Sequence, residues 1–177
     1  MLPRRIAFLG GNGHCAARLA AARRHLSEEI VLLDIPYPGF EGRPQAGGFE
    51  EFLKAVGSHL RRAAPERVYA TGIGGLLALC LRARGELLEI PLLFQAPILW
   101  GLERRLMPRT LRLGLARRAL LRLFATAPFQ RRFAATCFTH PPSPDMARAF
   151  FDGYARCAAA PDLFAWLTPA LLRSLER

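Results

Sequence analysis

The sequence predicts an α/β fold, a doubly wound and mostly parallel sheet with helices on both faces. Short apolar runs bounded by turn residues alternate with helical stretches up to residue 97. This alternation implies parallel strands joined by right-handed crossovers. The chain has 177 residues, of which 51% are hydrophobic, so it is long and apolar enough for one domain with a substantial core.

The predicted elements follow a regular order along the chain. Strands are expected where short apolar runs lie between turn residues, at Arg5–Leu9, Ile30–Asp34, Arg67–Ala70 and Leu92–Gln95. Helices are expected between successive strands, at about Cys15–Leu26, Phe49–Ala63 and Gly75–Ala83. Each connection between strands that follow one another in the sequence therefore contains one helix.

The character of the sequence changes after Pro97. No further strand is predicted, and the remaining residues are rich in Arg, Leu, Ala and Phe, with prolines that interrupt the helical pattern. We therefore expect an α/β core at 1–97 and a helical cap at 98–177. Such a cap covers the core with its apolar side and turns its arginines to water. The alternative is a basic amphipathic surface that docks on an acidic partner or an anionic lipid.

The chain is strongly basic. It has 25 Lys and Arg residues against 14 Asp and Glu, which gives a formal net charge of +11, and Lys54 is the only lysine. No nucleic-acid-binding motif accompanies this charge. Solvated arginines on helix faces are therefore the favoured interpretation, without a specific nucleic acid partner and without membrane contact.

The cysteines indicate neither a metal site nor a redox motif. They are far apart and form no C-x-x-C pair, at Cys15, Cys80, Cys137 and Cys157. They are best interpreted as small buried residues in a reducing compartment, which predicts a cytoplasmic protein. The alternative for Cys15 is a reactive thiol, because a helix start lowers the pKa of a thiol. No metal ion and no cofactor are expected.

A glycine-rich turn at residues 10–14 (GGNGH) follows the first predicted strand and opens a helix. Glycine lets the backbone approach a bound group, and the free N–H groups at a helix start favour negative charge. Two chemistries fit this pattern. One is dinucleotide binding through Gly11 and Gly13, with Asp34 as the ligand of a ribose hydroxyl. The other is a loop whose backbone N–H groups stabilise an oxyanion.

Three further segments resemble the α/β-hydrolase family. Residues 68–79 (VYATGIGGLLAL) match the strand, nucleophile elbow and helix of that family. Residues 34–44 (DIPYPGFEGRP) are similar to its D-x-P-G-x-G-x-S-x-x-P loop, with a shift of one residue, and residues 94–97 (FQAP) match the end of its next strand. The resemblance implies parallel strands in the order 2-1-3-4 with a helical cap, and an ester- or acyl-hydrolase ancestry.

The resemblance also implies what the site lacks. The middle position of the elbow, where the family keeps Ser, Cys or Asp, is Gly72 here, and neighbouring Thr71 is a weak substitute. The chain is therefore expected to be a pseudoenzyme without a complete catalytic triad. The backbone N–H groups of Asn12 and Ile73 remain as oxyanion donors. Gly72 is expected at a sharp turn beside Gly11 and Asn12, at the carboxyl edge of the sheet.

The favoured function is binding of a small apolar or acyl ligand between the elbow and the cap. Gly11 and His14 complete the expected ligand site, with His14 as a hydrogen-bond donor. In this interpretation Asp34 accepts backbone N–H groups of its own loop. The alternatives are a nucleotide- or dinucleotide-binding protein and a non-enzymatic interaction module with a basic cap.

The edges of the predicted sheet point to an oligomer. The strand that ends at Gln95 and the strand Ile30–Asp34 are expected to be its outer strands, and a bare edge invites pairing with another chain. We expect the helices after Pro97 or a second subunit to cover this region. The sequence thus predicts a homo-oligomer, a dimer with a largely apolar contact.

Overall fold

The computed structural model describes residues 3–11 and 16–95, together with isolated positions between 115 and 144. Strands and helices alternate in it as β1 (Arg4–Leu9), α1 (Ala16–Arg23), β2 (Ile30–Asp34), α2 (Phe49–Ala63), β3 (Arg67–Thr71), α3 (Ile73–Ala83) and β4 (Leu92–Gln95). The strands form one parallel sheet in the order β2-β1-β3-β4. The doubly wound α/β fold and the strand order predicted from the sequence are confirmed.

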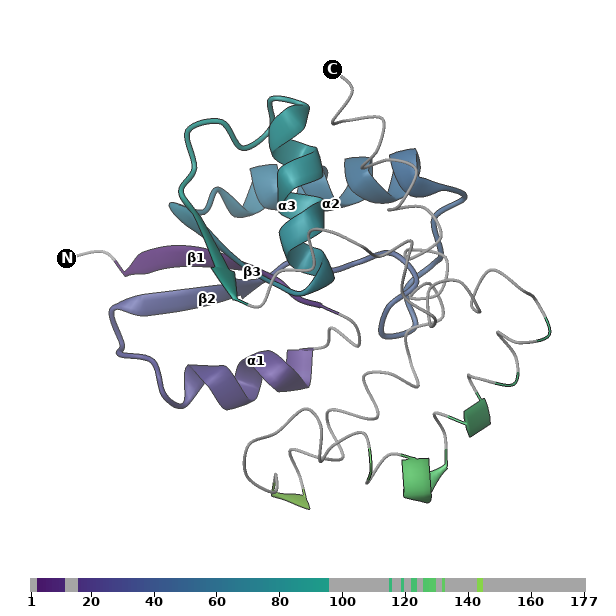
Figure 1. Ribbon diagram of the computed structural model, residues 1–177. Coiled ribbons are helices and arrows are strands. Elements are labelled where there is room, and N and C mark those ends of the chain that lie inside the picture. Colours follow the sequence, from purple (N-terminus) through teal and green to yellow (C-terminus); the bar gives the residue numbers. More distant parts are fainter. Residues whose placement is uncertain are drawn as a thin grey trace.

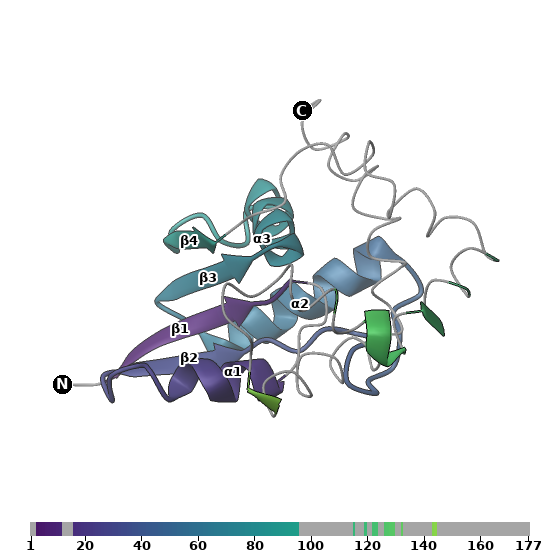
Figure 2. The same ribbon diagram turned by 60° about the horizontal axis from the view of Figure 1, so that its bottom comes forward.

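The sheet lies between two layers of helices (Figure 1). α1 covers one face beside β2, whereas α2 and α3 cover the other face, as Figure 2 shows from a second direction. Because the crossovers are right-handed, the direction of each connection along the sheet decides which face its helix covers. The connection from β1 to β2 runs in one direction along the sheet, and the connections from β2 to β3 and from β3 to β4 run in the other.

The main core lies between the sheet and the pair α2 and α3. Alternate side chains of the central strands are fully buried, namely Ala7 and Leu9 in β1 and Val68 and Ala70 in β3. α2 is amphipathic, and its buried residues form a stripe at helical spacing, at Phe52, Leu53, Val56, Gly57 and Leu60. α3 is buried along most of its length, as a helix over the centre of a sheet must be.

Two helix boundaries differ from the prediction. α3 begins at Ile73 rather than Gly75, so Gly74 lies in its first turn. This turn packs so closely on the end of β1 that Gly74 has no room for a side chain. α1 ends at Arg23 rather than Leu26, because the chain turns there and the Leu26 N–H donates to the Arg23 carbonyl at 3.3 Å.

β2 and β4 are the outer strands of the sheet within the described residues, as expected. Leu93 and Phe94 of β4 are 46% and 41% exposed, so this strand is apolar where it meets solvent. The predicted cap at 98–177 lies outside the described residues apart from isolated positions. Its boundary with the core stays a prediction, and so does the oligomer. No helix in the described part of the chain is long and apolar enough to span a membrane.

Candidate functional site

The ends of β1 and β3 meet where the connections of the sheet diverge. After β1 the chain crosses one face of the sheet toward β2, and after β3 it crosses the opposite face toward β4 (Figure 1). Open α/β sheets bind ligands outside the carboxyl ends of their strands at such a point. Gly10 and Gly11 follow β1 there, and Gly72 follows β3. The candidate site is therefore the backbone around these glycines.

Gly72 forms the sharp turn between β3 and α3. Its dihedral angles are φ 53° and ψ −120°, a region that residues with a side chain rarely adopt. It is the single residue between Thr71, which ends β3, and Ile73, which begins α3. Its N–H donates to the carbonyl of Gln95 at the end of β4, at 3.3 Å. This geometry is that of the strained strand-to-helix turn of a nucleophile elbow.

Glycines allow the elbow to pack directly on the end of β1. A Cβ atom at Gly74 would lie 2.0 Å from the carbonyl oxygen of Leu9, closer than any real Cβ contact. A Cβ atom at Gly11 would lie 3.3 Å from the carbonyl oxygen of Thr71, and one at Gly72 would lie 3.4 Å from the Cα of Gly11. The sharp turn at Gly72 therefore lies beside Gly11 at the carboxyl edge, which confirms the prediction for Gly11, whereas Asn12 lies outside the described residues.

Backbone amides are the polar groups that the elbow presents. Gly72 has no hydroxyl, and half-buried Thr71 belongs to β3 rather than to the turn. Ile73 is the first residue of α3, so its N–H has no acceptor inside the helix, and the positive end of the helix macrodipole lies at this point. Its role as an oxyanion donor stays a prediction. Four residues named in the sequence analysis lie outside the described residues, Asn12, Gly13, His14 and Cys15.

A buried tyrosine that sequence reasoning missed reaches the site from the loop after β2. The hydroxyl of Tyr37 donates to the carbonyl of Gly10 at 3.0 Å. Its ring packs edge-on against Phe40 and Phe52, with ring centroids 5.3 and 5.6 Å away. Burial raises the pKa of Tyr37 well above its usual value, and the charge of Asp34 adds to the rise. The hydroxyl therefore remains protonated, and remains a donor, at neutral pH.

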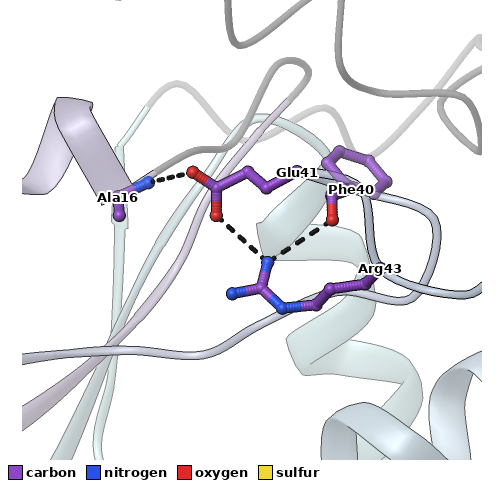
Figure 3. A network of polar contacts seen from close by, with 4 residues as sticks. All are labelled: Ala16, Phe40, Glu41 and Arg43. Carbon is purple, nitrogen blue, oxygen red and sulfur yellow. Dashed lines mark hydrogen bonds and ion pairs between the residues drawn. The ribbon is translucent and has the colours of Figure 1, made fainter.

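The same loop also holds the start of α1, through a glutamate that sequence reasoning missed (Figure 3). One carboxylate oxygen of Glu41 accepts the N–H of Ala16 at 2.9 Å, and the other pairs with the Arg43 guanidinium at 3.0 Å. Arg43 also donates to the carbonyl of Phe40 at 3.4 Å. Glu41 has φ 51°, which is unusual for a residue other than glycine, and these contacts hold it in that conformation.

The Glu41 carboxylate argues against the dinucleotide alternative. A pyrophosphate would use the first N–H groups of α1, where the carboxylate already accepts the N–H of Ala16 and repels a second anion. In the usual dinucleotide-binding fold the third strand lies next to the second, whereas β3 here lies next to β1. Asp34, the candidate ribose ligand, ends β2 opposite Phe8 of β1. Its expected role as an anchor of its own loop stays a prediction.

Other reactive groups of the core lie away from the elbow. Cys80 is in the middle of α3 and is buried, as predicted, and burial raises the pKa of its thiol to about 11. Burial therefore keeps this thiol protonated at neutral pH, which disfavours attack by its sulfur. Among residues 3–11 and 16–95, no three His, Cys, Asp or Glu side chains come together as metal ligands.

The sheet order and the elbow define the class of this protein, whose core has an α/β-hydrolase fold. No family model and no curated protein matches the chain. Among solved structures it is similar to RedJ, a thioesterase from the prodiginine biosynthetic pathway in Streptomyces coelicolor. The TM-score is 0.55 at 18% sequence identity, and the match covers 94% of this chain and 64% of RedJ.

A second similar structure is Smu.1393c from the cariogenic pathogen Streptococcus mutans. Here the TM-score is 0.54 at 19% sequence identity, and the match covers 90% of this chain and 61% of Smu.1393c. The chain therefore spans less than two thirds of the length of either structure. At these identities the likeness establishes the fold.

Proposed function

We propose that this chain binds a small acyl ligand at the edge formed by β1 and β3, and that it does not hydrolyse esters through an elbow nucleophile. The observation that carries the proposal is Gly72. Its backbone has the conformation of an elbow, with φ 53° and ψ −120°, but it has no side chain that could attack a carbonyl carbon.

The backbone around the elbow supports binding of an acyl oxygen. Such an oxygen accepts hydrogen bonds, and the N–H of Ile73 and the peptide that joins Gly10 and Gly11 border the same edge. Among the described residues, and apart from its chain neighbours Thr71 and Ile73, the Cα of Gly11 is the only atom within 4 Å of a Cβ built on Gly72. Within the described residues, a ligand therefore has room in the direction in which a nucleophile would extend.

The ligand class comes from the similarity to RedJ. That protein is described as a thioesterase, and a thioesterase acts on an acyl group in thioester linkage. We propose that this chain also binds an acyl group but does not catalyse the thioesterase reaction, because Gly72 supplies no nucleophile. A fatty acid such as octanoate is therefore a suitable probe, since its carboxylate oxygens accept hydrogen bonds and its chain is apolar.

Titration of octanoate into the isotope-labelled full chain tests the proposal. We expect saturable shifts of the Gly11 and Ile73 amide signals. Gly11→Ala should weaken binding, because its methyl group would lie at the site, 3.3 Å from the Thr71 carbonyl. Gly48→Ala is the matched control, because a Cβ there meets nothing within 4 Å and its φ of −178° suits any residue.

A parallel titration with NADH separates the acyl and dinucleotide interpretations. Shifts with NADH and none with octanoate would contradict the proposal and favour dinucleotide binding. Equal weakening of octanoate binding by Gly11→Ala and Gly48→Ala would also contradict it, because the ligand would then lie elsewhere.

A further inference from the structure

We propose that Tyr37 is a positioning residue of this site, whose hydroxyl fixes the peptide between Gly10 and Gly11 so that the Gly11 N–H is presented to the acyl oxygen. The inference rests on the proposed acyl-binding function and adds to it a residue that does not touch the ligand. It is carried by the buried hydrogen bond of 3.0 Å from the Tyr37 hydroxyl to the Gly10 carbonyl.

The Gly10 carbonyl is enclosed from two sides. The Tyr37 hydroxyl donates to its oxygen, and the same oxygen lies 2.8 Å from the position of a Cβ built on Gly74. The oxygen therefore lies between the tyrosine and the first turn of α3. Because the C=O and N–H of one trans peptide point in opposite directions, the hydrogen bond that holds the Gly10 oxygen also fixes the direction of the Gly11 N–H.

Gly11 lies directly against the elbow. A Cβ built on Gly72 would be 3.4 Å from the Cα of Gly11, and one built on Gly11 would be 3.8 Å from the backbone nitrogen of Ile73. Gly11 and Ile73 are therefore neighbours at this edge, where we expect a ligand oxygen to accept hydrogen bonds from both amides. The direction of the Gly11 N–H decides whether it contributes a hydrogen bond.

Tyr37 is itself held firmly enough for this role. Its side chain is fully buried, its ring packs edge-on against Phe40 and Phe52, and it stands between Pro36 and Pro38, which restrict the backbone. A buried hydroxyl without an acceptor is unfavourable, so the Gly10 carbonyl is the partner that this environment demands. Burial also raises the pKa of Tyr37, which keeps the donor intact over the physiological pH range.

Two variants of the full chain test the inference. Tyr37→Phe removes the hydroxyl and keeps the ring in its contacts with Phe40 and Phe52. Leu81→Val is the matched control, since Leu81 is fully buried in α3. It follows Ile73 by about 12 Å along the helix axis, so the change disturbs the core away from the elbow.

Two readouts follow the Gly11 amide and the ligand. In the absence of ligand, Tyr37→Phe should shift the Gly11 amide signal and speed its hydrogen exchange, whereas Leu81→Val should leave both unchanged. Octanoate should bind about tenfold more weakly to Tyr37→Phe, as expected when one oriented hydrogen bond is lost, and with unchanged affinity to Leu81→Val.

Failure of this inference is distinguishable from failure of the proposed function. If the wild-type chain does not bind octanoate, the proposed function is wrong, and the role of Tyr37 in binding is wrong with it. If the wild-type chain binds octanoate but Tyr37→Phe binds it equally well, or if both variants weaken binding equally, only the inference about Tyr37 is wrong.

Discussion

At Gly72 the main chain makes the turn of a nucleophile elbow without the side chain that such a turn usually carries. A residue with a Cβ would be strained there by about 1–3 kcal/mol, and glycine avoids that strain. Contacts on both sides hold the turn, because the Gly72 N–H binds the Gln95 carbonyl and Gly74 packs on Leu9. The geometry of the elbow is therefore a property of the surrounding backbone.

The missing hydroxyl leads to a prediction about activity. We expect the wild-type chain to release no p-nitrophenolate from p-nitrophenyl butyrate above the buffer rate, because nucleophile and base act as a unit and the elbow supplies neither. Stopped assays at several protein concentrations would measure this. A burst of product with an acyl adduct that peptide mapping assigns to Thr71 would contradict the prediction.

A second prediction concerns the contact between the elbow and β1. Gly74→Ala should destabilise the chain by about 3 kcal/mol or more, because the new methyl group collides with the backbone of Leu9, which cannot move without displacing β1. Urea unfolding followed by circular dichroism measures the change. Gly48→Ala, with open space around its Cβ, should change the free energy of unfolding by less than about 1 kcal/mol.

Among the elements, the loop between β2 and α2 connects parts that are distant in the sequence. Tyr37 reaches the end of β1, and Glu41 reaches the first residue of α1. Both ends of the connection between β1 and α1 are therefore attached to the same loop. A substitution in this loop should therefore affect the stability of α1 as well as the structure of the candidate site.

Glu41→Ala tests that attachment. We expect a loss of about 1 kcal/mol in the free energy of unfolding, because the Ala16 N–H loses its acceptor and the helix loses a favourable charge at its N-terminus. Hydrogen exchange in α1 should also become faster. The matched control is Glu89→Ala at an exposed position, which should leave both unchanged. Equal effects of the two variants would show that the Glu41 contact adds no stability.

His59 in α2 leads to a prediction about pH. Its Nδ1 accepts a hydrogen bond from Arg62 Nη2 at 2.7 Å, and partial burial, together with the charges of Arg62 and Arg43, lowers its pKa below the usual 6.5. The unfolded chain therefore binds a proton at His59 more readily than the folded chain does. The free energy of unfolding decreases as the pH falls below 6.5 toward the folded-state pKa. The Tm of the wild-type chain should drop more over this range than that of His59→Gln. An equal decrease in Tm for the two proteins over this pH range would contradict a lowered pKa of His59.

For the whole molecule, the apolar edge at β4 is the feature with the clearest consequence. Its exposed Leu93 and Phe94 lie on the outermost strand of the described sheet, and edge strands with apolar side chains favour association. We expect concentration-dependent self-association in sedimentation velocity. Phe94→Lys should reduce it, whereas Val31→Lys on the opposite edge strand should not. A strictly monomeric wild-type chain would contradict this prediction.

Local patterns explain why much of the fold was predictable. The bounds of β2, α2 and β4 agree with the structure to the residue, because apolar periodicity and turn residues act over a few positions. Gly72 was predictable for the same reason, since a turn rich in small residues between an apolar strand and an apolar helix specifies the elbow locally. The early start of α3 was missed, because the first turn of this helix packs on the end of β1, which lies far away in the sequence.

The sequence by itself determined the alternation of strands and helices, the glycine turns after β1 and β3, and the absence of a nucleophile at residue 72. Each of these depends on neighbouring residues and is visible in them. Only the tertiary structure decided that Tyr37 holds the Gly10 carbonyl and that Glu41 holds the start of α1. These contacts join residues that are 27 and 25 positions apart, and they form only where packing folds the loop after β2 over the end of β1. A tyrosine between two prolines was the one local sign of such a role.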